Sequence, residues 1–309
     1  MSCIKTVKRN LLSVKKERKM KNNAKAILRQ NGIFYLTGQL FILGIKLFYS
    51  KSSVPDLKWI LVPTSLWARI LSGIPFDYEP GSGYVSHSFR FIIAPSCSGV
   101  QFMLIAAATL LYSFVHRMPT RKKGICWTIL SFLISYIYTI LVNGLRIVLS
   151  IYLPLALPQN MWDNGWMTAE RLHTITGAVV YFTALFILYR PAGNLAVLIA
   201  GKPEEIQTET GRAEAPVRQP GRFSSPILGT LRKCLPPVFW YFAIALGIPF
   251  LNGAYAGNER NFTEYTLTLG TVCLILILLA CLPSFFSIVK RKKQNFRNVN
   301  NNCINAKHN

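Results

Sequence analysis

The sequence is poor in acidic residues and in charge of either sign. Only 12 of its 309 residues are Asp or Glu, and charged residues make up 15% of the chain. A soluble globular protein usually carries about 25% charged residues, so this composition excludes that class. Five stretches of 18 to 25 residues contain no Lys, Arg, Asp or Glu: Phe91–Val115, Gly124–Leu145, Leu172–Tyr189, Cys234–Asn258 and Tyr265–Val289. Each can span a bilayer, whose core needs about 20 apolar residues per helix.

Gly32–Ile45 is a sixth apolar stretch, with Lys46 placed to reach the membrane interface. The sequence therefore predicts an all-α, polytopic helical membrane protein with six spanning helices. Two shorter segments, Trp59–Phe76 and Ile147–Trp162, are interrupted by Pro, Gly or Arg. We expect them to form re-entrant or interfacial helices, giving up to eight segments in all. The alternating residues 84–91 predict a short strand or an extended lead-in.

Cysteine usage indicates neither a metal site nor a disulfide framework. The seven cysteines are odd in number and form no Cys-x-x-Cys pair, so we expect no cofactor and no bound metal. Cys126, Cys273 and Cys281 lie inside apolar stretches and are expected to be small buried side chains. No Asp or Glu lies within the six predicted spans, which leaves no obvious proton or cation relay for a transporter.

Basic residues cluster outside the spans and set the predicted topology. Of the 35 Lys and Arg, 27 lie in four segments: 1–30, 116–123, 190–233 and 290–309. Basic residues gather on cytoplasmic loops, so all four segments and both termini are expected on the cytoplasmic side of the inner membrane. The net charge of +23 also favours anionic lipid. Since no nucleic-acid motif accompanies the charge, membrane lipids are expected partners and nucleic acid is not.

Composition along the chain predicts four regions. These are a basic cytoplasmic arm over residues 1–30, a membrane core over 31–199, a cytoplasmic linker over 200–235 and a two-helix appendage with a basic tail over 236–309. The linker prediction rests on the Pro, Gly, Glu and Arg content after Gly201. The appendage contains no catalytic candidate, so we expect an accessory anchor or a partner-binding element.

Three residues whose side chains can carry out catalysis lie at predicted outer helix ends. Cys97 is expected one to two turns into its helix, Arg146 where the next span emerges, and His173 where the following span re-enters. A nucleophilic cysteine needs a nearby base or cation, and a developing oxyanion needs a donor or a positive charge. On the outer face of the membrane, these three side chains supply all of those roles.

Each of the three residues also has a structural interpretation. The segment Pro95-Ser-Cys-Ser-Gly99 can be a closely packed helix start, His173 can be an interfacial residue, and Arg146 can contact lipid headgroups. The residues alone therefore leave open a membrane cysteine enzyme, a transporter-like protein and a non-catalytic scaffold.

The order of three motifs resembles the exosortase/archaeosortase family over about residues 60–195. The motifs are Pro95-Ser-Cys-Ser-Gly99, Asn143-x-x-Arg146 and His173-x-x-x-Gly177. The resemblance implies a membrane cysteine protease or transpeptidase acting on exported proteins with a carboxy-terminal sorting signal. Such a signal has a short motif such as Pro-Glu-Pro, a transmembrane segment and a basic tail.

The same resemblance implies a role for each residue. Cys97 attacks the peptide carbonyl outside the membrane and forms a thioacyl intermediate, His173 acts as base and then acid, and Arg146 holds the oxyanion. Two further residues are possible supports. Asn143 is either a partner of Arg146 or a helix cap, and Glu170 either orients His173 or is a solvated charge at a helix start.

Overall fold

The computed structural model describes residues 29–158, 167–201, 226–251, 253, 262–279 and 282. Within them, six helices are long and apolar enough to cross a membrane: Arg29–Lys51, Pro95–Arg117, Arg121–Ala156, Arg171–Ala200, Cys234–Leu251 and Phe262–Leu279. The predicted all-α, polytopic membrane fold is confirmed.

The chain divides into two compact units. The first comprises Met1–Arg69, Ile74–Asn143 and Tyr189–Lys202, and the second comprises Ile70–Gly73, Gly144–Leu188 and Pro203–Asn309. Two long helices, α4 (Arg121–Ala156) and α6 (Ala169–Ala200), contribute residues to both.

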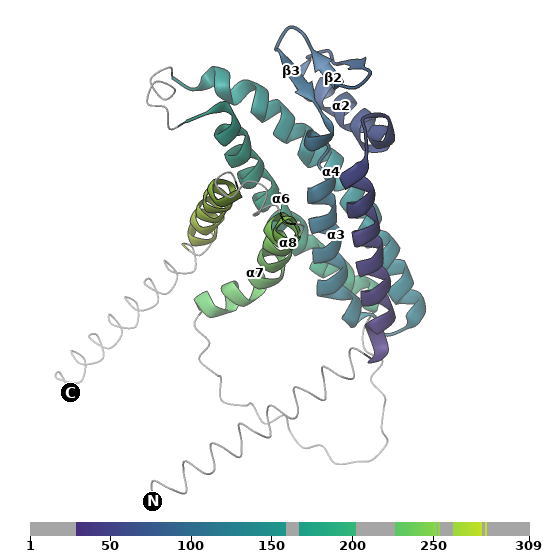
Figure 1. Ribbon diagram of the computed structural model, residues 1–309. Helices are drawn as coiled ribbons and strands as arrows, with labels where there is room; N and C mark the ends of the chain where they lie inside the picture. The colour runs from purple at the N-terminus through teal and green to yellow at the C-terminus, as the bar shows by residue number, and fades with distance from the viewer. Residues whose placement is uncertain are drawn as a thin grey trace, which may run out of the picture. The chain divides into compact units, whose positions relative to one another are not determined.

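Helix α3 (Val100–Phe114) forms the centre of the first unit. Twelve of its 15 residues are buried, because the helix is apolar on all sides and has neighbours around it. The helix Arg29–Lys51 lies beside it (Figure 1), where the Tyr112 hydroxyl donates to Gln39 Oε1 at 2.9 Å. After the turn η3 (Val115–Arg117), α4 returns along α3, and Trp127 Nε1 donates to the Leu110 carbonyl at 3.2 Å.

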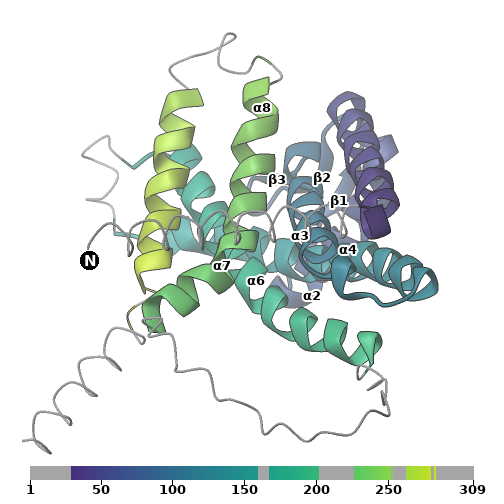
Figure 2. The ribbon, with the colours of Figure 1, turned by 90° about the horizontal axis from the view of Figure 1, so that it is seen from below.

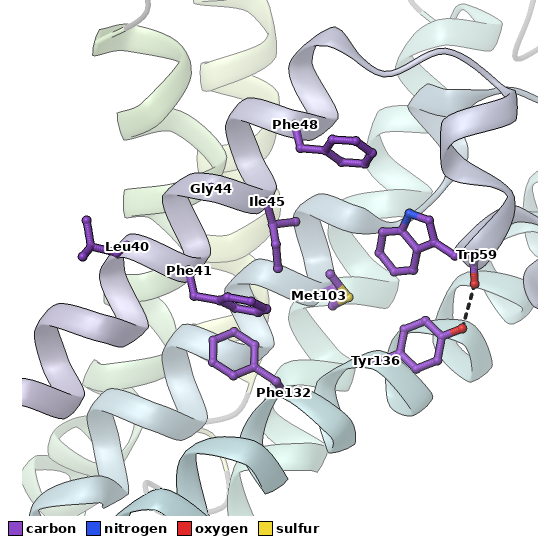
Figure 3. A pocket seen from close by; sticks show the side chains of 9 residues that line it. All are labelled: Leu40, Phe41, Gly44, Ile45, Phe48, Trp59, Met103, Phe132 and Tyr136. Carbon is purple, nitrogen blue, oxygen red and sulfur yellow. Dashed lines mark hydrogen bonds between the residues drawn. The ribbon is translucent and has the colours of Figure 1, made fainter.

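The first of the two predicted short helices is confirmed as a helix. It comprises η1 (Pro55–Leu57) and α2 (Lys58–Ser72). Near its start, the Trp59 ring stacks on Tyr136 of α4 at 5.7 Å, and the Tyr136 hydroxyl donates to the Trp59 carbonyl at 2.7 Å. These residues close one end of an apolar cavity of about 560 Å³ (Figure 3), which is lined by Leu40, Phe41, Gly44, Ile45, Phe48, Trp59, Met103, Phe132 and Tyr136.

A three-stranded antiparallel sheet follows α2 and leads into the candidate site (Figure 1). Its strands β1 (Asp77–Glu79), β2 (Gly83–Ser86) and β3 (Phe91–Ile93) lie in sequence order. The strand predicted over 84–91 is therefore confirmed in part. The prediction of a spanning helix from Phe91 onward is wrong for its first residues, because Pro95 disfavours helical backbone at the residue before it.

Helix α4 is longer than predicted and includes the first part of the second predicted short segment. It continues unbroken to Ala156, so a separate re-entrant helix beginning at Ile147 is wrong, and residues 159–162 lie outside the described residues. Its only proline, Pro154, falls in the last turn, where a lost hydrogen bond disturbs little of the helix. Its 36 residues span about 54 Å, more than the bilayer core of about 30 Å.

The second unit contains the carboxy-terminal helices. α7 (Pro226–Phe242), which begins within the predicted linker, continues through the π-helical turn η4 (Ala243–Gly247) into α8 (Ile248–Leu251). The helix Phe262–Leu279 lies alongside this continuous segment (Figure 2), with Phe262 and Phe250 ring centroids 6.4 Å apart. Phe182 of α6 packs edge-on against Tyr241 of α7 at 5.2 Å, and so joins these helices to the core of the unit.

The cysteine predictions have different outcomes. Cys273 is buried as expected, whereas Cys126 is exposed on α4, where its small apolar side chain faces away from the packed helices. Cys281 lies outside the described residues. The correction for Cys126 follows from helix geometry, because one face of a long spanning helix contacts lipid instead of protein.

Candidate active site

Cys97 lies in a tight turn that joins β3 to α3. The turn η2 (Pro95–Cys97) is a 3₁₀ segment in which the Cys97 amide donates to the Ala94 carbonyl at 2.8 Å. Pro95 fixes its own φ angle and so suits the first position of such a turn. The prediction that Cys97 lies one to two turns inside a helix is wrong, because α3 begins only at Val100.

Gly99 allows this turn to pack closely against α4. Its φ of +78° lies in the left-handed region, which costs any residue with a Cβ about 1–2 kcal/mol. A Cβ at this position would also come 3.0 Å from Asn143 and from Thr139. The glycine of the Pro-x-Cys-Ser-Gly motif is therefore explained by both backbone conformation and space.

Asn143 supports the turn from α4. It is fully buried, and its Nδ2 donates to the Cys97 carbonyl oxygen at 2.7 Å. The alternative of a helix cap is wrong, because Asn143 lies far inside α4. From the helix Arg29–Lys51, the Tyr49 hydroxyl donates to the Pro95 carbonyl at 3.2 Å. Two side chains thus fix the turn through its backbone carbonyls, while Cys97 itself is 8% exposed.

In the second unit, Arg146 of α4 contacts His173 of α6 directly. Arg146 Nη2 approaches His173 Nε2, and since a guanidinium has no acceptor, Nε2 accepts and the ring proton lies on Nδ1. Arg146 is buried, and its guanidinium carbon lies 5.3 Å from the Tyr181 ring centroid. The expectation that Arg146 ends a helix is wrong, because α4 continues ten residues beyond it.

Gly177 makes room for the arginine side chain. It follows His173 by one turn of α6, and a Cβ there would come 3.1 Å from Arg146 Nε. This contact gives a physical reason for the glycine in His173-x-x-x-Gly177. His173 is the fifth residue of α6, close to the helix start as expected. Glu170 lies in the first turn, and its side chain is outside the described residues.

The carboxy-terminal helices supply residues that the sequence reasoning missed. Tyr241 of α7 is buried in the second unit, where its ring packs against Phe182 of α6. Two residues before His173 in the sequence, Arg171 Nε donates to Glu264 Oε1 at 2.5 Å, which ties the helix Phe262–Leu279 to the start of α6. The available signal was the presence of tyrosines inside or beside apolar stretches, where a buried hydroxyl needs a polar partner.

The predicted residues therefore form two sets. Cys97 and Asn143 belong to the first unit, and Arg146 and His173 belong to the second. In the part of the chain that the structure describes, no group of three or more His, Cys, Asp or Glu side chains is arranged to hold a metal ion.

Comparisons with known proteins identify the family. No curated protein and no solved structure matches the chain significantly. Among models of protein families, the transmembrane exosortase family matches residues 31–190, just over half of the chain and a range that includes Cys97, Arg146 and His173. The chain belongs to the transmembrane exosortase family.

Proposed function

We propose that this protein is a membrane cysteine protease or transpeptidase that cleaves carboxy-terminal sorting signals of exported proteins. Family membership supports a sorting role at a membrane in general. The observation that carries the specific proposal is the contact between Arg146 and His173, which unites two of the three motif residues although 27 positions separate them. Cys97, held in a fixed turn by Asn143, is the proposed nucleophile.

The proposed reaction begins at the Cys97 thiol. His173 takes the thiol proton, and the thiolate attacks the carbonyl carbon of the scissile peptide bond. A C–S bond forms, and the negative charge that develops on the carbonyl oxygen is stabilised by Arg146. The oxyanion then collapses, the C–N bond breaks, and the leaving amine takes the proton from His173. An amine or a water molecule finally attacks the thioester, giving transpeptidation or hydrolysis and restoring the thiol.

The contact between Arg146 and His173 adds a step to this scheme. In the structure His173 Nε2 accepts from Arg146, so its lone pair is engaged. A substrate carbonyl that attracts the guanidinium would release Nε2 to act as the base. Substrate binding and base activation would then be coupled through a single arginine side chain.

The length of α4 supports chemistry at the outer face. A helix rises 1.5 Å per residue, so about 38 Å of α4 separates Arg121 from Arg146. The bilayer core is about 30 Å thick. With the basic loop before α4 in the cytoplasm, Arg146 would reach the opposite edge of the core, where exported substrates are available. This placement makes the inner membrane of the cell the proposed location.

A comparison of carboxy-terminal peptides tests the proposal even when the identity of the substrate is not known. Exported proteins from wild-type cells and from Cys97→Ala cells are compared by mass spectrometry. We expect a set of proteins to retain its carboxy-terminal signal only in the variant, whereas Cys126→Ala, the matched control, should process like wild type. A thioester between substrate and Cys97 should be released by hydroxylamine. Identical carboxy-terminal peptides in wild type and Cys97→Ala would contradict the enzyme and favour a transporter or a scaffold.

A further inference from the structure

Strand β3 has an outer edge directly before the turn that holds Cys97. The sheet order is β1-β2-β3, and among the described residues β3 pairs only with β2. Ala94 continues the extended backbone with φ −84° and ψ 170°, and Pro95–Cys97 follow at once. An unpaired strand edge therefore leads without interruption to the proposed nucleophile.

The two edges of the sheet differ in chemistry. β1 carries Asp77 and Glu79, and charged side chains at an edge oppose pairing with another strand. β3 consists of Phe91, Ile92 and Ile93, which favour strand pairing and carry no charge. Of these, Ile92 is 48% exposed. The charged edge, on β1, is the one farther from Cys97 in the sheet. The uncharged edge, on β3, continues directly into the turn that holds Cys97.

The backbone groups at the outer edge belong to Ile92. A Cβ on Gly83 of β2 would contact the Ile93 carbonyl oxygen, so that carbonyl faces β2. In an antiparallel pair, successive residues direct their N–H and C=O groups to opposite sides of the strand. Phe91 and Ile93 therefore bond toward β2, and Ile92 presents one donor and one acceptor outward.

We propose that the cleavage motif of the substrate binds as an added strand along the outer edge of β3. An extended peptide gains main-chain hydrogen bonds from such an edge, and alternate side chains are read by the surrounding surface. Because β3 continues into the Cys97 turn, a peptide aligned on Ile92 is guided toward the thiol. This inference rests on the proposed function and adds the mode of substrate recognition to it.

A pair of substitutions at Ile92 tests the backbone role. Proline at an edge position whose N–H faces outward keeps the pairing with β2 but removes the donor for the substrate. The reporter is an exported protein that retains its signal in Cys97→Ala cells. Ile92→Pro should raise the KM for this reporter roughly three- to tenfold, the equivalent of one lost hydrogen bond. Ile92→Ala keeps the backbone donor, so it should raise this KM clearly less than Ile92→Pro does.

The controls separate docking from catalysis and from folding. Thermal unfolding of the purified full-length variants should show that each is folded, and Cys97 should react with iodoacetamide at the wild-type rate. If Ile92→Pro does not fold, Ile92→Lys provides the second variant, because an edge lysine opposes strand addition as the acids of β1 do. Wild-type processing by Ile92→Pro, or equal losses in Ile92→Pro and Ile92→Ala, would overturn strand addition while leaving Cys97 as the nucleophile. Normal processing in Cys97→Ala cells would instead overturn the proposed function.

Discussion

The side-chain amide of Asn143 donates a 2.7 Å hydrogen bond to the backbone carbonyl of Cys97. This bond joins α4 to the turn between β3 and α3, and it acts on the backbone of the proposed nucleophile instead of on its thiol. Asn143 therefore positions Cys97 in the first unit, although its spacing in the sequence pairs it with Arg146.

Replacing Asn143 should destabilise the protein. Asn143→Leu keeps the number and branching of the side-chain heavy atoms but removes the donor, and an unsatisfied buried polar group costs about 1–3 kcal/mol. Thermal unfolding in detergent measures this loss. Asn194→Leu is the matched control, because Asn194 is exposed on α6 and its replacement should leave the unfolding temperature unchanged. Equal stability of the two variants would show that the bond to Cys97 contributes nothing.

Gly99→Ala should be more harmful than the same change elsewhere. It combines a left-handed φ with contacts at 3.0 Å, so we expect a loss of about 2 kcal/mol or more. Gly73 has a φ of +71° with open space around it, so Gly73→Ala should cost only the conformational part, about 1–2 kcal/mol. Chemical denaturation of the two variants in parallel gives their free energies of unfolding and separates the cost of the left-handed φ from the cost of the close contacts. If both variants lose the same free energy of unfolding, the close contacts between α4 and Gly99 do not add to the cost.

The proposed oxyanion role of Arg146 requires its guanidinium. Lysine keeps the charge but replaces a planar group of five donors with a compact ammonium. Loss of one oxyanion donor typically slows turnover about 10²–10³-fold. Arg146→Lys should therefore insert normally, remain alkylatable at Cys97 and process its reporter at least roughly 10²-fold more slowly. Near-normal processing would contradict the proposed role of Arg146 in the reaction.

The addition of a single methyl group at Gly177 should displace the Arg146 side chain. Gly177→Ala places a Cβ 3.1 Å from Arg146 Nε and should displace the guanidinium from His173. We expect reporter processing to fall with little loss of protein from the membrane. Gly193→Ala on the same helix meets only ordinary contacts at 3.6 Å from Phe114, so it should process normally. Similar activity of the two variants would contradict a role for the Arg146 position.

Membrane topology can be tested with cysteines introduced at Ser82 and Thr120. Ser82 lies between β1 and β2, and Thr120 lies between α3 and α4, so the whole of α3 separates them along the chain. In a background without native cysteines, an impermeant maleimide should label Ser82→Cys in intact cells and Thr120→Cys only after permeabilisation. The reverse pattern would place the Cys97 turn in the cytoplasm and contradict the proposed site of action.

The sequence predicted the helical membrane class because long uncharged stretches have no stable alternative in a bilayer. It did not predict the limits of the helices. The residues Phe91–Ile93 are apolar and form a strand, and apolar character alone does not distinguish a short strand from a helix. Arg146 marks a predicted membrane edge, but arginine is a good helix former and so does not end α4.

The motif residues could be identified from the sequence, but their partners could not. Periodicity places Asn143 and Arg146 on one face of a helix. It gives no information on which other segment packs there, and Asn143 contacts a turn 46 residues earlier in the chain. Tyr241 and Glu264 were missed for the same reason, because they contact α6 through tertiary packing alone.

The packing of Tyr241 against Phe182 and the bond between Arg171 and Glu264 have a consequence for truncation. The exosortase match ends at residue 190, which makes Ala200 an obvious place to shorten the protein. A chain cut there would expose the Phe182 ring and leave Arg171 without Glu264, nine and two residues from His173 along α6. We therefore expect a stable shortened version to retain the helices up to Leu279.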